Sequence, residues 1–204
     1  MPNWCFNSIE ISGEKDKVKR IKTILDLRED DYFFKSLLGE APEANWYDAN
    51  INNLGTKWDV SVGKECLSES DDYINFSCES AWSPPVAGMV NVCKKYGVDC
   101  VMNYEESGND FYGRTTIKSD GTLTEQDYEY REGMYVLDNE WFWENLTGND
   151  MEYLTENIQD EMEGDSTYTI KEFVDGEFSY VTDKDKKEII VLFEEELETQ
   201  KEKI

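Results

Sequence analysis

Carboxylate side chains dominate the chemistry that this sequence could perform, and imidazole is missing from it. The 204 residues contain 46 Asp and Glu, 20 Lys and Arg, and no His. The chain therefore has no Ser-His-Asp or Cys-His nucleophile, no histidine general base and no histidine-ligated zinc. Adjacent carboxylates such as Glu105 and Glu106 are too common in this acidic chain to mark an acid-base pair. We therefore predict that the protein is not an enzyme.

Glycine-loop, nucleophile and cysteine motifs point to neither a cofactor nor a dedicated metal ion. The sequence contains no P-loop, GxGxxG or GxSxG motif. Its five cysteines are odd in number and show no CxxC spacing, so we expect reduced thiols. They are Cys5, Cys66, Cys78, Cys93 and Cys100. Cys78, Cys93 and Cys100 lie among apolar residues and are expected to be buried rather than reactive.

The formal net charge of −26 restricts the possible partners. Direct binding of nucleic acid or of an anionic membrane surface needs Lys and Arg patches, which this overall charge opposes. The favoured partners are basic: a nucleic-acid-binding protein, a cationic ligand or metal ions. Equally open is the alternative that the acidity serves solubility alone. No signal peptide or membrane-spanning segment is recognisable, which predicts a cytoplasmic protein.

Acidic residues are concentrated in the last two-fifths of the chain. Residues 122–204 contain 25 acidic and 7 basic residues, against 21 and 13 in residues 1–121. Rows of carboxylates on rigid helices could imitate duplex DNA, which carries about one charge per 1.7 Å of its axis, although a single row is more often a solvated helix face. The predicted partner-binding residues are Glu152, Glu156, Asp160, Glu161, Glu163, Glu194, Glu195, Glu196 and Glu198, with Trp141 and Trp143 as aromatic anchors.

Tryptophans at predicted strand ends give a second candidate site. A pocket for a small ligand or a nucleotide signal would need polar groups to converge beside these rings. The residues for such a pocket are Lys57, Trp58, Trp82, Tyr104 and Glu105. The alternative is that Trp4, Trp58 and Trp82 form an aromatic core at one end of a sheet.

The elements that position these groups are clearest over residues 76–113. An alternating strand runs to Trp82, Ser83-Pro84-Pro85 stops it and begins a helix, and Gly97 ends that helix. A second alternating strand covers residues 98–104, and a turn cluster then leads into a further strand at Phe111. These signals predict a β-α-β unit.

The preceding residues complete a recognisable order of elements. The sequence predicts a strand over 3–12, a helix over 14–28, a short helical turn with a long loop over 31–55, and a hairpin of strands at 58–62 and 73–78. The order β-α-β-β-α-β is that of the ferredoxin-like split βαβ fold, with two helices on one face of an antiparallel sheet. Residues 114–118 are expected to add one extra strand.

Residues 122–204 are predicted to be mostly helical, so the chain is α+β with a boundary at Gly121. Asp138 is expected to cap one short helix and Asn149 a second, and a final helix should start at Asp183 or Asp185. Residues 167–174 and 178–181 are predicted to form a small hairpin around Asp175-Gly176. The predicted domains are a ferredoxin-like domain, 1–121, and an acidic helical region, 122–204.

Four separated motifs resemble a known family. They are MPNWC at 1–5, NLGTKWD at 53–59, AWSPP at 81–85, and the spaced set Tyr104, Gly108, Phe111 and Gly113. Over about residues 1–121 the chain resembles the Api92-like or YubB ferredoxin-like family of bacteriophages and plasmids, with Leu54 where members often have Trp. The resemblance implies a ferredoxin-like fold and a mobile-element origin, and it implies no catalytic residues.

Together these features favour an inhibitor over the other function classes. The leading prediction is a non-enzymatic phage or mobile-element protein that binds a basic, nucleic-acid-binding host defence protein through a DNA-mimicking acidic surface, as an anti-restriction or anti-CRISPR factor would. The alternative is a small-ligand or nucleotide-signal binding protein.

Overall fold

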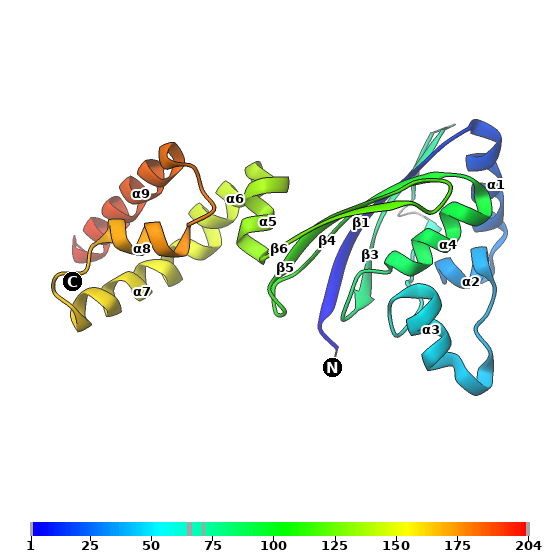
Figure 1. Ribbon diagram of the computed structural model, residues 1–204, viewed down its shortest axis with the longest axis horizontal. Coiled ribbons are helices and arrows are strands. Elements are labelled where there is room, and N and C mark those ends of the chain that lie inside the picture. The colour runs from blue at the N-terminus through cyan, green and yellow to red at the C-terminus, as the bar shows by residue number, and fades with distance from the viewer. Residues whose placement is uncertain (1, 65–66, 71, 203–204) are drawn as a thin grey trace. The chain divides into compact units, whose positions relative to one another are not determined.

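The computed structural model describes residues 2–64, 67–70 and 72–202, so Cys66 lies outside the described residues. The chain divides into two compact units, Met1–Tyr130 and Arg131–Ile204 (Figure 1). The division lies at Tyr130 rather than at Gly121 because a further strand of the sheet follows Gly121.

The N-terminal unit is built on an antiparallel sheet with the strand order β2-β3-β1-β4-β5-β6 in the described part of the chain. The strands are β1 (Trp4–Ser12), β2 (Ser68–Glu69), β3 (Tyr73–Ala81), β4 (Asp99–Glu106), β5 (Phe111–Ile117) and β6 (Leu123–Tyr128). β1 lies between β3 and β4 and runs antiparallel to both. The order β2-β3-β1-β4 is the ferredoxin-like arrangement, so the predicted split βαβ fold is confirmed.

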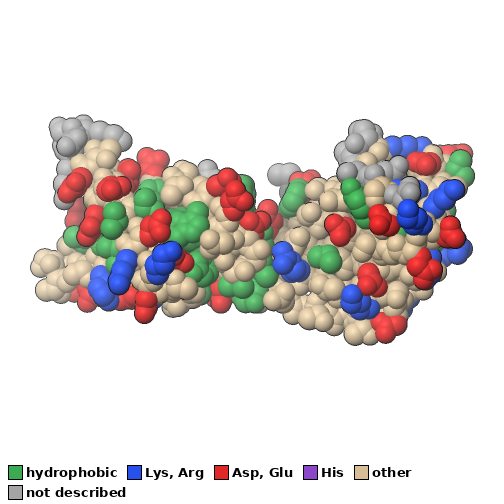
Figure 2. Space-filling view, turned by 90° about the horizontal axis from the view of Figure 1, so that it is seen from above, with side chains coloured by type: hydrophobic (Ala, Val, Ile, Leu, Met, Phe, Trp, Pro, Cys, Tyr) green, Lys and Arg blue, Asp and Glu red, His purple; other side chains and the backbone are tan. Residues whose placement is uncertain are grey.

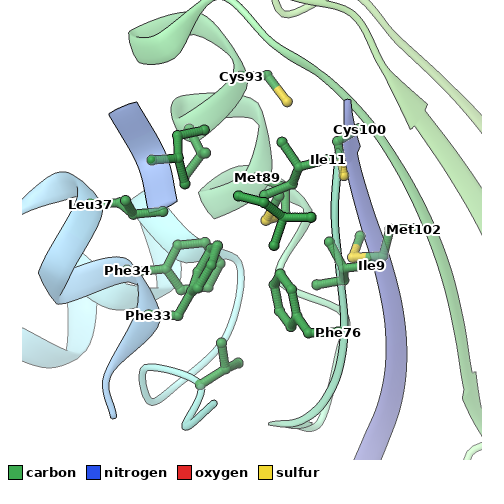
Figure 3. Close-up of a cluster of buried hydrophobic side chains, with 14 of the residues drawn as sticks. Ile9, Ile11, Phe33, Phe34, Leu37, Phe76, Met89, Cys93, Cys100 and Met102 are labelled. Atoms are coloured by element: carbon green, nitrogen blue, oxygen red, sulfur yellow. The ribbon is translucent and has the colours of Figure 1, made fainter. Parts of the chain in front are cut away.

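Helices cover one face of this sheet (Figure 1). They are α1 (Lys15–Leu27), α2 (Phe33–Leu38), α3 (Trp46–Leu54) and α4 (Val86–Tyr96), with a short 3-10 turn at Glu43–Asn45. Alternate residues of β1 and β3 are buried, as expected for strands with one covered face. Figure 3 shows Phe33 and Phe34 of α2 pointing towards Phe76 of β3 and Ile9 of β1. This cluster is the core of the N-terminal unit.

The connection between α1 and β3 differs from the prediction in two ways. In residues 31–55, α2 agrees with the predicted short helical turn, and the buried side chains of Phe33, Phe34 and Leu37 anchor it in the core. The helix α3 lies where a long loop was predicted. Residues 58–62 are not a strand of the sheet. Their backbone bonds residues 31–33 instead: Phe33 N donates to Val60 O (3.0 Å) and Val62 N donates to Asp31 O (2.9 Å). On the side of β3 away from β1, the pairing strand is β2.

The sheet gains two strands beyond the ferredoxin-like four, where one was predicted. β6 pairs antiparallel with β5 from Leu123 to Tyr128. Its side chains are exposed or half-buried throughout. The strand therefore lacks the apolar alternation by which a half-buried strand is recognised in a sequence.

The C-terminal unit is helical, as predicted. Its helices are α5 (Tyr130–Leu137), α6 (Asn139–Asn145), α7 (Met151–Gly164), α8 (Ile170–Glu177) and α9 (Asp183–Glu202). The largest buried side chains are three phenylalanines, Phe142, Phe178 and Phe193, whose rings meet edge to face or tilted at centroid distances of 6.4 Å. An aromatic core of this kind lets short helices pack without a sheet.

Two predictions for this unit are confirmed and two are wrong. Asp138 caps α6 by accepting a hydrogen bond from Trp141 N, and α9 starts at Asp183. The residue before α7 is Asp150, at the end of a π-helical turn (Leu146–Asp150), so residue 149 does not begin that helix. The predicted hairpin is helix α8.

The start of α8 explains why the hairpin does not form. Thr169 and Glu172 make a capping box, in which the Thr169 side chain accepts from Glu172 N and the Glu172 side chain accepts from Thr169 N. Phe173 and Val174 then face the core of the unit. Local capping and burial thus outweigh the turn signal at Asp175-Gly176.

Candidate functional site

The acidic residues of α7 form a regularly spaced, solvent-exposed row. Glu152, Glu156 and Asp160 follow one another at four-residue intervals, and Glu163 comes three residues later. Residues at these intervals share a helix face, with about 6 Å of axial rise for each four-residue step. Glu161 is a fifth exposed carboxylate, but it lies on another side of the helix, about 100° around the axis from Asp160. The helix therefore holds these charges in a fixed order.

A polar contact joins α9 to α7. Gln159 Nε2 of α7 donates to Gln200 Oε1 of α9 at 2.9 Å, which joins the C-terminal halves of the two helices. Glu194, Glu195 and Glu198 are exposed. Glu196 is half-buried and accepts from Gln200 Nε2 at 3.3 Å, so it also supports this contact.

The position of these acids opposes the helix dipole. Glu161 and Glu163 lie in the last turn of α7, which contains no basic residue. A negative charge at a helix C-terminus is unfavourable because the unpaired carbonyls there already carry partial negative charge. The described ion pairs of the unit lie elsewhere: Arg131 pairs with Asp150 and Glu177, and Asp175 pairs with Lys171 and Lys186.

The two predicted aromatic anchors lie on α6, apart in sequence from both acidic rows. Trp141 is 39% exposed and can contact a partner. Trp143 is half-buried, and its ring centroid lies 5.4 Å from that of Phe142. Trp143 therefore serves the core as well as the surface. In Figure 2, acidic side chains are spread over the face shown, with basic and apolar side chains among them.

The five residues predicted for a ligand pocket do not converge. Tyr104 is 4% exposed, its hydroxyl donates to the Asp127 carboxylate, and its ring lies against Gly113. Burial raises the pKa of this phenol, and the hydrogen bond to Asp127 raises it further. Glu105 is the next residue of β4 and points to the opposite face of the sheet, because side chains alternate along a strand. Tyr104 and Glu105 therefore cannot join the tryptophans in one pocket.

The predicted aromatic core of three tryptophans is also wrong. Trp4, Trp58 and Trp82 are 49%, 38% and 48% exposed. The ring centroids of Trp4 and Trp58 lie 6.1 Å apart, and Lys57 Nζ lies 4.4 Å from the centroid of the Trp58 ring. Trp4 and Trp58 therefore form an aromatic pair at the surface, where β1 begins, rather than part of a core.

Backbone contacts at this corner explain the spacing of three of the family-like motifs. The hydroxyl of Thr56 donates to Ala81 O (3.0 Å) and accepts from Ala81 N (3.1 Å). Ser83 Oγ donates to Gly55 O at 2.7 Å. Trp82 N donates to Asn3 O at 3.0 Å. NLGTKWD and MPNWC therefore both contact AWSPP. These contacts hold the three segments together at this corner of the sheet.

A cavity of about 1010 Å³ lies beside this corner, within the N-terminal unit. Of the predicted ligand residues, Trp58 lines it. The other residues of its wall that carry rings or charges are Tyr32, Phe34, Lys35, Glu40, Glu43, Trp46 and Asp59. Of these residues, Asp59 is a polar group that the sequence already suggested for a pocket beside the tryptophans. The others were missed because a short helical turn and a long loop were expected over residues 31–55. The aromatic pairs in that stretch were the available signal.

Asp59 fixes one wall of the cavity. Its carboxylate accepts from Phe34 N at 2.9 Å and from Lys35 N at 2.6 Å, which satisfies the first turn of α2. Burial raises the pKa of Asp59, and these N–H donors oppose the shift. Lys35 Nζ lies 2.9 Å from Asp30 Oδ2 and 3.5 Å from Glu40 Oε1, so its charge is balanced locally.

Metal-binding clusters and membrane-spanning helices are two other features to consider in residues 2–64, 67–70 and 72–202. No group of three or more His, Cys, Asp or Glu side chains in that part of the chain is placed to hold a metal ion. None of the helices there is long and apolar enough to cross a membrane. Cys5, Cys78, Cys93 and Cys100 are free thiols, as predicted. Burial was predicted for Cys78, Cys93 and Cys100 and is confirmed, and Cys5 is buried as well.

The sheet and its helices define the N-terminal unit as a ferredoxin-like α+β domain with two added strands. Comparison with known families agrees. The model of the family described as the ferredoxin-like domain in Api92-like protein matches residues 57–141.

This match confirms the predicted resemblance for the segment that runs from Lys57 through β6 and into α6, and leaves MPNWC outside it. No curated protein and no solved structure matches the chain.

Proposed function

We propose that the C-terminal unit binds a basic protein whose normal ligand is nucleic acid, and that the carboxylates of α7 and α9 occupy its phosphate-binding surface. The supporting observation is the exposed acidic row of α7, a helix that the contact between Gln159 and Gln200 joins to the acidic helix α9. The protein acts without catalysis, as an inhibitor carried by a phage or another mobile element. Its target is a defence component in the host cytoplasm, of the restriction or CRISPR type.

The charge spacing along α7 suits this role. Four carboxylates of α7, those of Glu152, Glu156, Asp160 and Glu163, share one face over about 17 Å of helix, with about 4.5 to 6 Å of axial rise between neighbours. One strand of duplex DNA carries about one phosphate per 3.4 Å of axis, so this row could pair with a subset of the Arg and Lys side chains that bind phosphates. Charge-assisted hydrogen bonds to a carboxylate are strong.

Solubility alone does not account for the placement of the acids. A solubilising surface has no need of negative charge in the last turn of α7, where Glu161 and Glu163 oppose the helix dipole. Binding sites often retain such locally unfavourable choices because a partner compensates for them. A basic partner would do so here by supplying cations to this end of the helix.

The test is affinity purification from the host, with the protein as bait and washes of rising salt. Captured protein should be basic, should be released as salt screens the charges, and should be displaced by duplex DNA. A variant that neutralises α7, Glu152→Gln with Glu156→Gln, Asp160→Asn, Glu161→Gln and Glu163→Gln, should capture none of it.

A matched control removes the same number of exposed charges from the N-terminal unit. Its substitutions are Glu10→Gln, Asp26→Asn, Glu29→Gln, Asp48→Asn and Glu79→Gln. This control should capture the partner as the unaltered protein does. Capture that is indifferent to salt, or that survives neutralisation of α7, would show that the acidic helices are not the binding surface.

A further inference from the structure

Aromatic rings from three separate segments line the cavity of the N-terminal unit. Tyr32 precedes α2, Trp46 begins α3 and Trp58 follows α3. The cavity volume of about 1010 Å³ is at the upper end of the range of ligand sites, roughly 300 to 1,000 Å³. Trp46 is 43% exposed and Trp58 is 38% exposed, so both rings remain accessible.

Hydrogen bonds hold the walls of this cavity in place. Asn50 Nδ2 of α3 donates to Lys57 O at 3.0 Å, which fixes the segment that carries Trp58. Asn91 Nδ2 of α4 donates to Asn53 O at 2.9 Å, which fixes the end of α3. With Asp59 accepting from the first turn of α2, the helices α2 and α3 and residues 57–59 are tied to one another or to α4. These parts of the wall are therefore preformed, and binding does not need to order them.

The charges of the lining favour a cation over an anion. Glu40, Glu43 and Asp59 line the cavity together with Lys35, and the ammonium of a second cation, Lys57, lies 4.4 Å from the centroid of the Trp58 ring. Lys35 is engaged by Asp30 and Glu40, so it is poorly available to a phosphate. An anionic nucleotide would also enter against the overall charge of −26.

The rings of the cavity wall already attract ammonium groups of the protein itself. Lys57 Nζ lies 4.4 Å from the centroid of the Trp58 ring, and Lys35 Nζ lies 5.9 Å from the centroid of the Tyr32 ring. Aromatic faces attract cations through the ring quadrupole, and Trp does so best. Recognition of organic cations by several rings and a carboxylate rests on the same attraction.

We propose that this cavity binds an organic cation, an alkylammonium or guanidinium group, packed against Trp46 and Trp58 with the Glu43 carboxylate nearby. Such a group can belong to a free polyamine or to a Lys or Arg side chain of a peptide. The site lies wholly within the N-terminal unit and is independent of the acidic helices of the C-terminal unit.

The test is titration of the full-length protein with agmatine, spermidine and adenosine monophosphate, followed by calorimetry and by amide chemical shifts. The two cations should bind and shift amides of residues 32–59, and the nucleotide should not. A short neutral peptide with one central Arg, compared with the same peptide carrying Gln, separates the two sources of the cation. Binding of both agmatine and the Arg peptide would show that the group alone suffices.

Matched variants in α3 and in the 3-10 turn before it test the roles of Trp46 and Glu43. Trp46→Ala should weaken agmatine binding by about fivefold or more, as loss of a cation–π contact would, and Glu43→Gln should weaken it most at low salt. Ile51→Ala is the control for Trp46, since Ile51 is a similarly exposed residue of α3 (41%) that does not line the cavity. Asp48→Asn is the control for Glu43.

Three results would overturn the proposal. They are a preference for the nucleotide, absence of saturable cation binding up to about 10 mM, and unchanged binding by Trp46→Ala. Circular dichroism of each variant shows whether it is folded. The amide chemical-shift changes of the unaltered protein show where the cation binds, and this result does not depend on any variant. Because none of these changes touches α7 or α9, failure here leaves the affinity purification unaffected.

Discussion

The two units of this protein use polar side chains in opposite ways. In the N-terminal unit, polar groups are buried and bind backbone: Thr56 and Asn7 are 0% exposed, and Asn7 Nδ2 donates to Cys5 O at 2.9 Å. In the C-terminal unit the core is mainly apolar and aromatic, and the carboxylates of α7 and α9 remain at the surface. The first unit therefore depends on specific polar contacts for its fold, while the second carries its charge largely apart from its fold.

Among the substitutions that test this contrast, one at Gly113 is expected to change the free energy of unfolding most. A Cβ atom there would lie 2.4 Å from the Tyr104 ring and 2.7 Å from an Asp127 oxygen. Gly113→Ala should lower the free energy of unfolding by about 3 kcal/mol, measured by urea denaturation. Gly176→Ala in α8 is the control, because nothing lies within 4 Å of its added Cβ. That substitution should be neutral or stabilising, and similar losses at both glycines would remove the contrast.

A smaller loss is expected on removing the Thr56 hydroxyl. Thr56→Val keeps the shape but leaves Ala81 N and O without their buried partner, which costs about 2 kcal/mol. Thr199→Val in α9 removes an exposed hydroxyl that donates to Glu195 O at 2.9 Å. Its effect on the denaturation midpoint should be close to zero. If Thr56→Val is as mild as the control, buried polar contacts are not what distinguishes the N-terminal unit.

The buried thiols give the N-terminal unit a sensitivity to alkali. Burial raises the pKa of Cys5 and of Cys78 from 9.0 to about 12. Between these values the unfolded chain loses protons that the folded chain keeps, so stability falls as pH rises. From pH 8 to pH 9.5 the two thiols should lower the free energy of unfolding by about 1.5 kcal/mol.

Urea denaturation under reducing conditions at both pH values measures this loss. The double variant Cys5→Ala and Cys78→Ala should lose less stability over the same pH interval than the unaltered protein does. An equal loss in both proteins would assign the alkaline effect to other groups.

The smallest predicted effect is a gain in stability, and it is expected for substitutions in α7. Glu161→Gln and Glu163→Gln remove charges that oppose the helix dipole, so each should raise the thermal midpoint of the C-terminal unit by about 2 °C at low salt. Glu172→Gln, in the first turn of α8, should lower it instead, because Glu172 accepts from Thr169 N at 2.9 Å. A loss of stability in the α7 variants would mean that their carboxylates support the fold.

The same contrast separates what could be predicted from sequence. The split βαβ arrangement was predictable because β1, β3 and β4 alternate apolar and polar residues, and because Ser83-Pro84-Pro85 and Gly97 bracket α4. β6 and α8 were not, since β6 has no apolar face and α8 depends on a capping box weighed against a turn signal. Local patterns report burial, of which β6 has little, and they do not show whether a capping box or a competing turn signal prevails, as in α8.

The sites were predictable to different degrees. The acidic rows could be assigned because exposed positions on a helix follow directly from sequence spacing. The cavity could not, since it requires three rings from Tyr32, Trp46 and Trp58 to meet through the packing of α2 and α3. Tyr104 was misassigned because its burial depends on pairing with β5 and β6, which sequence spacing does not reveal.

The contact between Gln159 and Gln200 gives the acidic helices a useful independence from ionic conditions. It joins two uncharged amides, so added salt does not screen it as it screens ion pairs. If the carboxylates bind a basic partner as proposed, salt would weaken that binding while this contact between α7 and α9 persists. The partner would then be released without unfolding of the helices, and would bind again when the ionic strength falls.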